Sequence, residues 1–164
     1  MKLRASRSAQ YPLEASFTFT PFNWVNDSVD LGAKTLGATV ALSTDPTQAG
    51  LVGPVANTIV FDALPLPTGA VLIGGEVIVG VGYVGPTAAT LSLGTAAAPT
   101  SLVNAVDITA VARTPLSLAT PLASQDGSNL RMTLTYSGGN ATAGSVRLRV
   151  MYTIDGRAHE VQIT

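Results

Sequence analysis

Apolar and polar residues alternate along several short segments of the chain. In the clearest example Leu130, Met132, Leu134 and Tyr136 alternate with polar residues. A period of two is typical of a strand with one buried face, and no stretch has the period of a helix of ordinary length. Such segments recur between turns rich in Gly and Pro. The pattern therefore predicts an all-β protein, an antiparallel β-sandwich or jelly roll of roughly eight to ten short strands.

Three apolar runs between Asn57 and Thr95 form the segment around which we expect the sandwich to be built. The central run is expected to place four side chains on a packed face: Val77, Val79, Val81 and Tyr83. Its other face is expected to be nearly bare and carries Glu76, Ile78, Gly80 and Gly82. Glycines inside a strand mark either a bend that closes the sandwich or a place where another backbone or surface comes close.

The residues before this segment predict three further strands. Glu14–Phe22 places Phe17 and Phe19 on one face, and its proline favours a position at the edge of a sheet. A short strand ending at Leu31 and another over Lys34–Ser43 are expected to follow.

Trp24 is the only tryptophan, and we expect it to be a core residue. One isolated aromatic side chain makes a poor platform for a sugar or a base. An exposed ligand platform is the alternative interpretation.

The region after the central segment is less regular. We expect a turn, with at most one helical turn, over Ala96–Asn104, a strand over Ala105–Val111 and a Pro-containing surface loop over Arg113–Ser128.

A two-residue turn at Asp155 and Gly156 predicts a C-terminal hairpin in which Tyr152 faces His159. This register places Arg147 and Arg149 on the outward face, together with Glu160 and Gln162, and Arg131 joins them if its strand is the neighbour. Two interpretations stay open. The arginines belong either to a solvated face that prevents edge pairing or to a basic patch that binds an acidic partner surface.

The first residues have almost nothing apolar to bury. We therefore predict an extended N-terminal arm over residues 1–13 and a single sandwich domain over residues 14–164. Candidate partner-binding residues in the arm are Lys2, Arg4, Arg7 and Tyr11. A neighbouring subunit or a larger assembly is expected to hold the arm, and the alternative is that it folds back on its own domain.

Composition favours a protein that works in an assembly. Of the 164 residues, 12% are charged and 46% are hydrophobic, and the mean hydropathy is +0.37. A surface with so few charges should expose contact patches. The net charge of −1 gives no support for nucleic-acid binding.

No segment predicts a membrane anchor or a secretory signal. The most apolar window, Gly69–Val84, is interrupted by Glu76 and is shorter than the roughly 20 residues of a spanning helix, so we interpret it as a buried pair of strands. The basic N-terminus lacks an apolar region, which favours synthesis in a cytoplasm.

The residues give little support for catalysis. The chain has no cysteine and one histidine, His159, which we interpret as structural, and its carboxylates are scattered without an evident pair. We therefore expect no enzyme activity, no cofactor and no metal site.

Two long segments nevertheless suggest a family. ATLSLGTAAAPTSLVNAVDITAVARTPLSL, from Ala89 to Leu118, and NLRMTLTYSGGNATAGSVRLRVMYTI, from Asn129 to Ile154, resemble the small jelly-roll decoration or cement proteins of tailed-bacteriophage capsids. The resemblance covers roughly residues 57–164 and depends on the general pattern, because no diagnostic motif is present. It implies a virion protein, made in the host cytoplasm, that binds the major capsid protein on the capsid exterior at capsomer junctions. It also implies a homo-oligomer, a trimer or a dimer, that stabilises the head.

Two other functions stay open. A carbohydrate- or receptor-binding virion module shares the jelly-roll scaffold, but it would need exposed aromatic side chains. A small hydrolase would need a catalytic set that the sequence does not reveal.

Overall fold

The computed structural model describes residues 12–28, 33–37, 58–118, 123–124 and 129–154. The predicted arm up to Tyr11, with Lys2, Arg4 and Arg7, and the predicted C-terminal turn with His159 lie outside the described residues. The division into arm and domain therefore stays a prediction.

The described residues form an all-β structure with no helix. The strands are β1 (Leu13–Phe19), β2 (Trp24–Asn26), β3 (Ala33–Thr35), β4 (Thr58–Pro65), β5 (Ala70–Val84), β6 (Ala88–Gly94), β7 (Val103–Asp107), β8 (Ala112–Pro115), β9 (Ala123–Ser124), β10 (Asn129–Ser137) and β11 (Ala143–Ile154).

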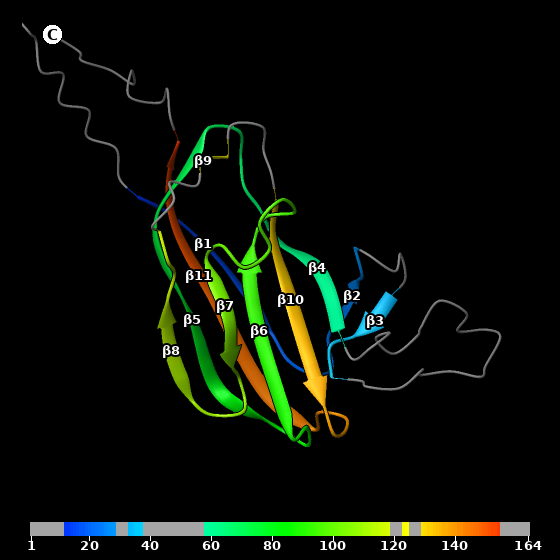
Figure 1. Ribbon diagram of the computed structural model, residues 1–164. Helices are drawn as coiled ribbons and strands as arrows, with labels where there is room; N and C mark the ends of the chain where they lie inside the picture. Colours follow the sequence, from blue (N-terminus) through cyan, green and yellow to red (C-terminus); the bar gives the residue numbers. More distant parts are fainter. Residues whose placement is uncertain (1–11, 29–32, 38–57, 119–122, 125–128, 155–164) are drawn as a thin grey trace, which may run out of the picture.

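Two sheets face each other in the body of the molecule. One has the strand order β1-β11-β5-β8, with β9 added beside β5, and the other has the order β4-β10-β6-β7. In Figure 1 the second sheet lies in front of the first, and the small β2-β3 hairpin lies beside β4. All pairings are antiparallel, so the predicted antiparallel β-sandwich is confirmed.

The order of the strands is that of a jelly roll. Leaving aside β2, β3 and β9, the first strand pairs with the last, β1 with β11, and successive inner pairs are β4 with β10, β5 with β8 and β6 with β7. This is one long hairpin, and rolling it up brings β5 beside β11 and β6 beside β10. The consecutive strands β4, β5 and β6 therefore alternate between the sheets and do not pair with one another.

The core lies between the sheets, where the alternating side chains meet. Leu130, Met132 and Leu134 from β10 are fully buried, as are Val146 and Leu148 from β11. The predicted period of two is confirmed for both strands. The predicted edge strand is also confirmed, because β1 ends its sheet.

The prediction that Val81 packs with Val77 and Val79 is wrong, because a bulge changes the register. Val79 lies opposite Val146 and Val81 lies opposite Ser145, so Gly80 is the extra residue. Val77 and Val79 are buried, whereas the side chain of Val81 is 51% exposed.

One of the predicted glycines of β5, Gly82, lies against another segment of the backbone. A Cβ atom on Gly82 would collide with the backbone of Thr109, so the glycine lets the segment before β8 pass close to β5. Of the two interpretations of these glycines, the close approach of another backbone applies at Gly82, and that backbone belongs to the same chain.

Three other predicted boundaries are corrected. The window 69–84 contains the single long strand β5 and not a pair of strands. The strand predicted over Ala105–Val111 is β7, which begins earlier and ends at Asp107, and the residues before it form turns without a helix. Arg113, predicted to begin a loop, lies within β8.

Candidate functional site

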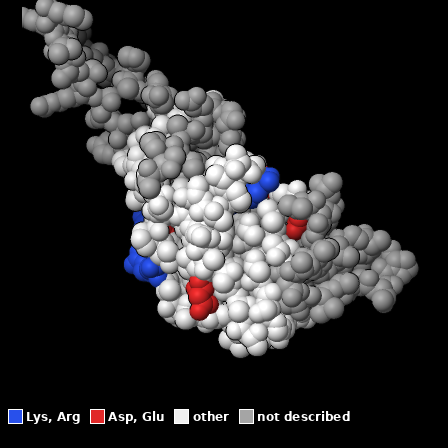
Figure 2. Space-filling view, viewed as in Figure 1, with Lys and Arg blue, Asp and Glu red and all other residues white. Residues whose placement is uncertain are grey.

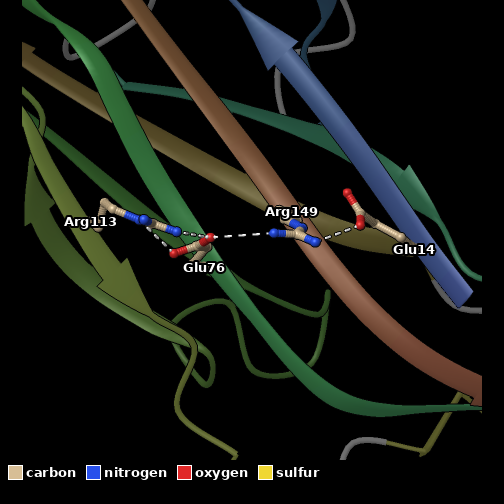
Figure 3. A network of polar contacts seen from close by, with 4 residues as sticks. All are labelled: Glu14, Glu76, Arg113 and Arg149. Carbon is tan, nitrogen blue, oxygen red and sulfur yellow. Dashed lines mark hydrogen bonds and ion pairs between the residues drawn. The ribbon is translucent and has the colours of Figure 1, made fainter. Parts of the chain in front are cut away.

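Four charged side chains form a row across the outward face of the sheet β1-β11-β5-β8. Glu14 lies on β1, Arg149 on β11, Glu76 on β5 and Arg113 on β8, so the sign of the charge alternates from strand to strand. Figure 3 shows the four side chains reaching toward one another along this row. We call these four residues the ladder.

The contacts within the ladder are close. Arg113 donates from Nε to Glu76 Oε2 at 2.9 Å and from Nη2 to Glu76 Oε1 at 2.6 Å, which is a two-pronged ion pair. Arg149 donates from Nη2 to Glu14 Oε2 at 2.8 Å, and its Nη1 lies 4.0 Å from Glu76 Oε1. The network of charges is therefore continuous across four strands.

The strand register produces this arrangement. Arg149 lies directly opposite Glu76 on the neighbouring strand. Arg113 lies opposite Ile78, two residues along β5 from Glu76, and Glu14 lies opposite Met151, two residues along β11 from Arg149. Long side chains can span such diagonal positions.

The ion pairs shift the titration of the ladder. The hydrogen bond from Arg113 is the main cause that lowers the pKa of Glu76 below its ordinary value of 4.5, and the charges of Arg113 and Arg149 add to the effect. The same hydrogen bond raises the pKa of Arg113, and Glu14 raises the pKa of Arg149. Because the side chains of Arg113, Arg149 and Glu14 are 68%, 42% and 47% exposed, we expect the ion pairs of the ladder to orient the side chains more than they stabilise the fold.

Arg147 adds a positive charge beside the neutral ladder. It is exposed on β11, two residues before Arg149, and lies opposite Ile78 and Thr18. Among the described residues it forms no ion pair. Arg147 and Arg149 alternate with buried residues of β11, so they share the outward face as predicted.

Exposed valines lie near the ladder. The side chains of Val81 on β5 and of Val111, just before β8, are 51% and 73% exposed. We call the outward surface formed by the ladder, Arg147, Val81 and Val111 the ladder face.

The structure decides the conditional prediction about Arg131 and adds an arginine that was not predicted. Arg131 does not join Arg147 and Arg149, because β10 lies in the other sheet, between β4 and β6. Its Nε donates to Asp62 Oδ1 at 3.1 Å. Arg113, by contrast, was not predicted as a site residue. Its place between the smaller residues Ala112 and Thr114 was only a weak signal of a strand.

The outward face of the other sheet has a different chemistry. Thr135 on β10 lies opposite Thr58 on β4 and Thr90 on β6, and Thr90 lies opposite Asp107 on β7. We call this surface the hydroxyl face. Figure 2 shows that the surface over β6, β7 and β10 carries few charged side chains.

A cleft opens beside the hydroxyl face, between β1, β2, β4 and β10. Its volume is about 680 Å³, and its lining includes Phe17, Trp24, Phe61, Asp62 and Arg131. The prediction that Trp24 is a core residue is wrong, because 58% of its surface is exposed. We call this hollow the Trp24 cleft.

Neither a metal centre nor a membrane span was found in the part of the chain that the structure describes. Within the described ranges, no group of three or more His, Cys, Asp or Glu side chains is placed to hold a metal ion. The same ranges contain no helix that could span a membrane.

Comparison with known proteins identifies a related fold. A chain of the cyanophage Pam1 capsid asymmetric unit is similar to this protein with a TM-score of 0.59 and 16% sequence identity, over 94% of each chain. At this identity the similarity establishes the fold alone. No protein-family model and no curated protein matches the chain.

Proposed function

We propose that the protein is a structural component of a phage virion, a decoration or cement protein that binds the outer surface of the capsid. The observation that carries the proposal is the fold shared with a chain of the cyanophage Pam1 capsid asymmetric unit over 94% of both chains. The resemblance of residues 57–164 to capsid cement proteins supports it independently. In this role the protein is not an enzyme and needs no cofactor.

The ladder face is the surface that we propose to contact the major capsid protein. Interfaces are enriched in arginine and need exposed apolar area, and this face offers both in Arg113, Arg147, Val81 and Val111. The ladder is neutral as a whole, so Arg147 provides the net charge. We expect it to bind an acidic patch on the capsid.

Binding of this kind stabilises a capsid by mass action. A protein that binds the assembled lattice but not its separated subunits shifts the equilibrium toward the lattice. Many modest contacts repeated by symmetry then add up to a large effect. A trimer or dimer placed at a junction between capsomers would engage several capsid subunits at once.

The first experiment asks whether the protein is part of the particle and lies outside it. Virions of the encoding phage are purified, their proteins are identified by mass spectrometry, and intact particles are treated with protease. We expect the protein in stoichiometric amounts and accessible to protease while the packaged genome stays protected. Its absence from particles would refute the proposal, and its resistance in intact but not opened particles would place it inside.

The N-terminal arm is proposed as a second attachment element through Lys2, Arg4, Arg7 and Tyr11. Deleting residues 1–10 should lower the number of copies retained on particles while the melting temperature of the isolated protein stays nearly unchanged. Full retention by the shortened chain would remove the arm from the proposal.

A further inference from the structure

The Trp24 cleft has an exposed aromatic side chain on a strand whose backbone is anchored on both sides. The turn before it is fixed by Asn23, whose side-chain oxygen accepts hydrogen bonds from the Thr20 backbone N–H at 2.7 Å and from the Thr20 hydroxyl at 3.0 Å. Trp24 itself lies opposite Thr35 in the β2-β3 hairpin. Exposing 58% of a tryptophan on an ordered strand leaves a large apolar surface uncovered.

The other end of β2 is attached to the sandwich. Asp27 is only 3% exposed, and its Oδ2 accepts a hydrogen bond from the Val60 backbone N–H at 3.0 Å. The Ser28 backbone N–H donates to the Val60 carbonyl at 2.6 Å. Because β2 is anchored on both sides of Trp24, the backbone at Trp24 has little conformational entropy to lose when a ligand contacts the indole ring.

A fixed polar group also lines the cleft. Asp62 accepts a hydrogen bond from Arg131 Nε at 3.1 Å and another from Asn129 Nδ2 at 3.1 Å. The described contacts of Arg131 use only Nε, so its two terminal nitrogens can still donate to a ligand. The Asp62 and Arg131 side chains are 39% and 25% exposed, which leaves acceptor and donor atoms within reach of a bound molecule.

The charges of the cleft indicate a neutral ligand. Three charged side chains line the cleft. Asp27 is 3% exposed and accepts a hydrogen bond from the Val60 backbone N–H, whereas the more exposed Asp62 and Arg131 form an ion pair that favours neither an anion nor a cation. The combination of an exposed aromatic face with adjacent donors and acceptors suits a molecule that has an apolar face and a rim of hydroxyl groups. A pyranose ring has this chemistry, and the volume of about 680 Å³ lies within the range of ligand sites.

We propose that the Trp24 cleft binds a neutral oligosaccharide, with a sugar ring stacked on Trp24 and its hydroxyl groups hydrogen-bonded to Asp62 and Arg131. The cleft opens at the edge of the sandwich, between β1 of the ladder sheet and β2, β4 and β10, and none of the four ladder residues lines it. On a capsid exterior such a cleft would be available to surface glycans of a host cell.

The sole tryptophan makes the test direct, because all tryptophan emission of the full chain comes from Trp24. The purified protein is titrated with a panel of neutral oligosaccharides built from glucose, galactose, mannose or N-acetylglucosamine while the emission spectrum is recorded. We expect at least one member to give a saturable change with a Kd in the range of about 1 μM to 1 mM. No saturation by any member up to about 10 mM would overturn the proposal.

Variants then locate the binding. Trp24→Ala and Asp62→Asn should each weaken the affinity for the best oligosaccharide by about tenfold or more, measured by isothermal titration calorimetry. Phe22→Ala is the matched control, because Phe22 is 65% exposed and does not line the cleft, and its affinity should stay within about twofold of wild type. Circular dichroism and thermal melting establish that each variant is folded.

Three results would contradict the assignment. Wild-type affinity in a folded Trp24→Ala protein would place the sugar elsewhere. An equal loss in Phe22→Ala would indicate a general surface effect. Binding of sulfated but not neutral oligosaccharides would show that the positive charge of Arg131 decides the ligand and that the ion pair with Asp62 does not cancel it.

Discussion

The two outward faces of the sandwich each carry a row of side chains that crosses four strands, and the two rows differ in chemistry. On the ladder face, one residue from each of four strands forms a row of alternating charge. On the hydroxyl face the corresponding row is Thr58, Thr135, Thr90 and Asp107, again one residue from each of four strands. The closest contact between threonines of this row is 3.5 Å, between the hydroxyl oxygens of Thr58 and Thr135.

This difference separates the tasks that the two faces can perform. Serine is depleted from protein interfaces, and threonine and serine rarely contribute much binding energy, whereas arginine is enriched. The hydroxyl face is therefore suited to contact with solvent. The ladder face carries oriented arginines, a residue type enriched at interfaces, so it is the face that we propose for docking.

The largest expected effect is a loss of stability, and it tests whether the two sheets share one core. Leu148 on β11 and Leu134 on β10 are both fully buried, one behind each face. Leu148→Ala and Leu134→Ala should each lower the free energy of unfolding by about 2–5 kcal/mol, because each substitution leaves a cavity. Urea unfolding followed by circular dichroism measures the loss. A large loss of unfolding free energy for one variant and almost none for the other would contradict a single core shared by both sheets.

The sequence was sufficient to predict that the chain forms a sandwich, because the alternation of buried residues in β10 and β11 is local information. It was not sufficient to assign strands to sheets. Arg131 and Arg149 have similar local patterns, and only the rolled topology places them on opposite layers. A candidate site composed of residues from several strands therefore could not be predicted in full.

Two errors have more specific physical causes. The extra residue at Gly80 changes which face Val81 occupies, and a simple period of two cannot register a bulge. Trp24 was assigned to the core because one isolated aromatic side chain makes a poor ligand platform. Its exposure follows from the β2-β3 hairpin, which lies beside the sandwich and is attached to it through Asp27.

The second largest expected effect is on attachment to the capsid, and it compares the ladder face with the hydroxyl face. Arg147→Glu reverses the one charge of the ladder face that lacks an ion pair among the described residues. It should weaken binding to capsids by about tenfold or more, because an attractive contact becomes a repulsive one. Co-sedimentation with particles stripped of the protein measures the affinity.

The control for Arg147→Glu places the same negative charge on the opposite face. Thr135 is exposed on β10. The Thr135→Glu substitution should leave the affinity for capsids within about twofold of wild type. If Thr135→Glu weakened attachment and Arg147→Glu did not, the hydroxyl face would be the docking surface.

A smaller effect is expected from the centre of the ladder. Glu76→Gln removes the carboxylate that contacts both Arg113 and Arg149, whereas Glu14→Gln removes a contact with Arg149 alone. We expect Glu76→Gln to lower the urea midpoint slightly and Glu14→Gln to lower it less, with both shifts far below that of Leu148→Ala. Both shifts should shrink in high salt, which screens exposed ion pairs. A reversed order would mean that the ladder is not centred on Glu76.

The smallest effect compares one carboxyl group from each face as the pH falls. Arg113 lowers the pKa of Glu76 below 4.5, and Asp107, which accepts hydrogen bonds from the Thr109 hydroxyl at 2.7 Å and backbone N–H at 2.8 Å, has its pKa lowered below 3.8 by these bonds. Both groups have a lower pKa in the folded state than in the unfolded state. Each therefore adds stability above its unfolded pKa, and this stability is lost as the pH falls through the folded value.

Salt should distinguish these two groups, because Glu76 is held by a charged partner and Asp107 by neutral ones. In NMR titrations of the side-chain carboxyl carbons, raising the ionic strength from about 0.01 M to about 0.5 M should move the pKa of Glu76 upward toward 4.5. The pKa of Asp107 should change less, since its hydrogen bonds come from the uncharged Thr109. Equal shifts would show that the general field of the protein acts on both carboxyl groups, and the difference between the ion-paired Glu76 and the hydrogen-bonded Asp107 would then lose its electrostatic basis.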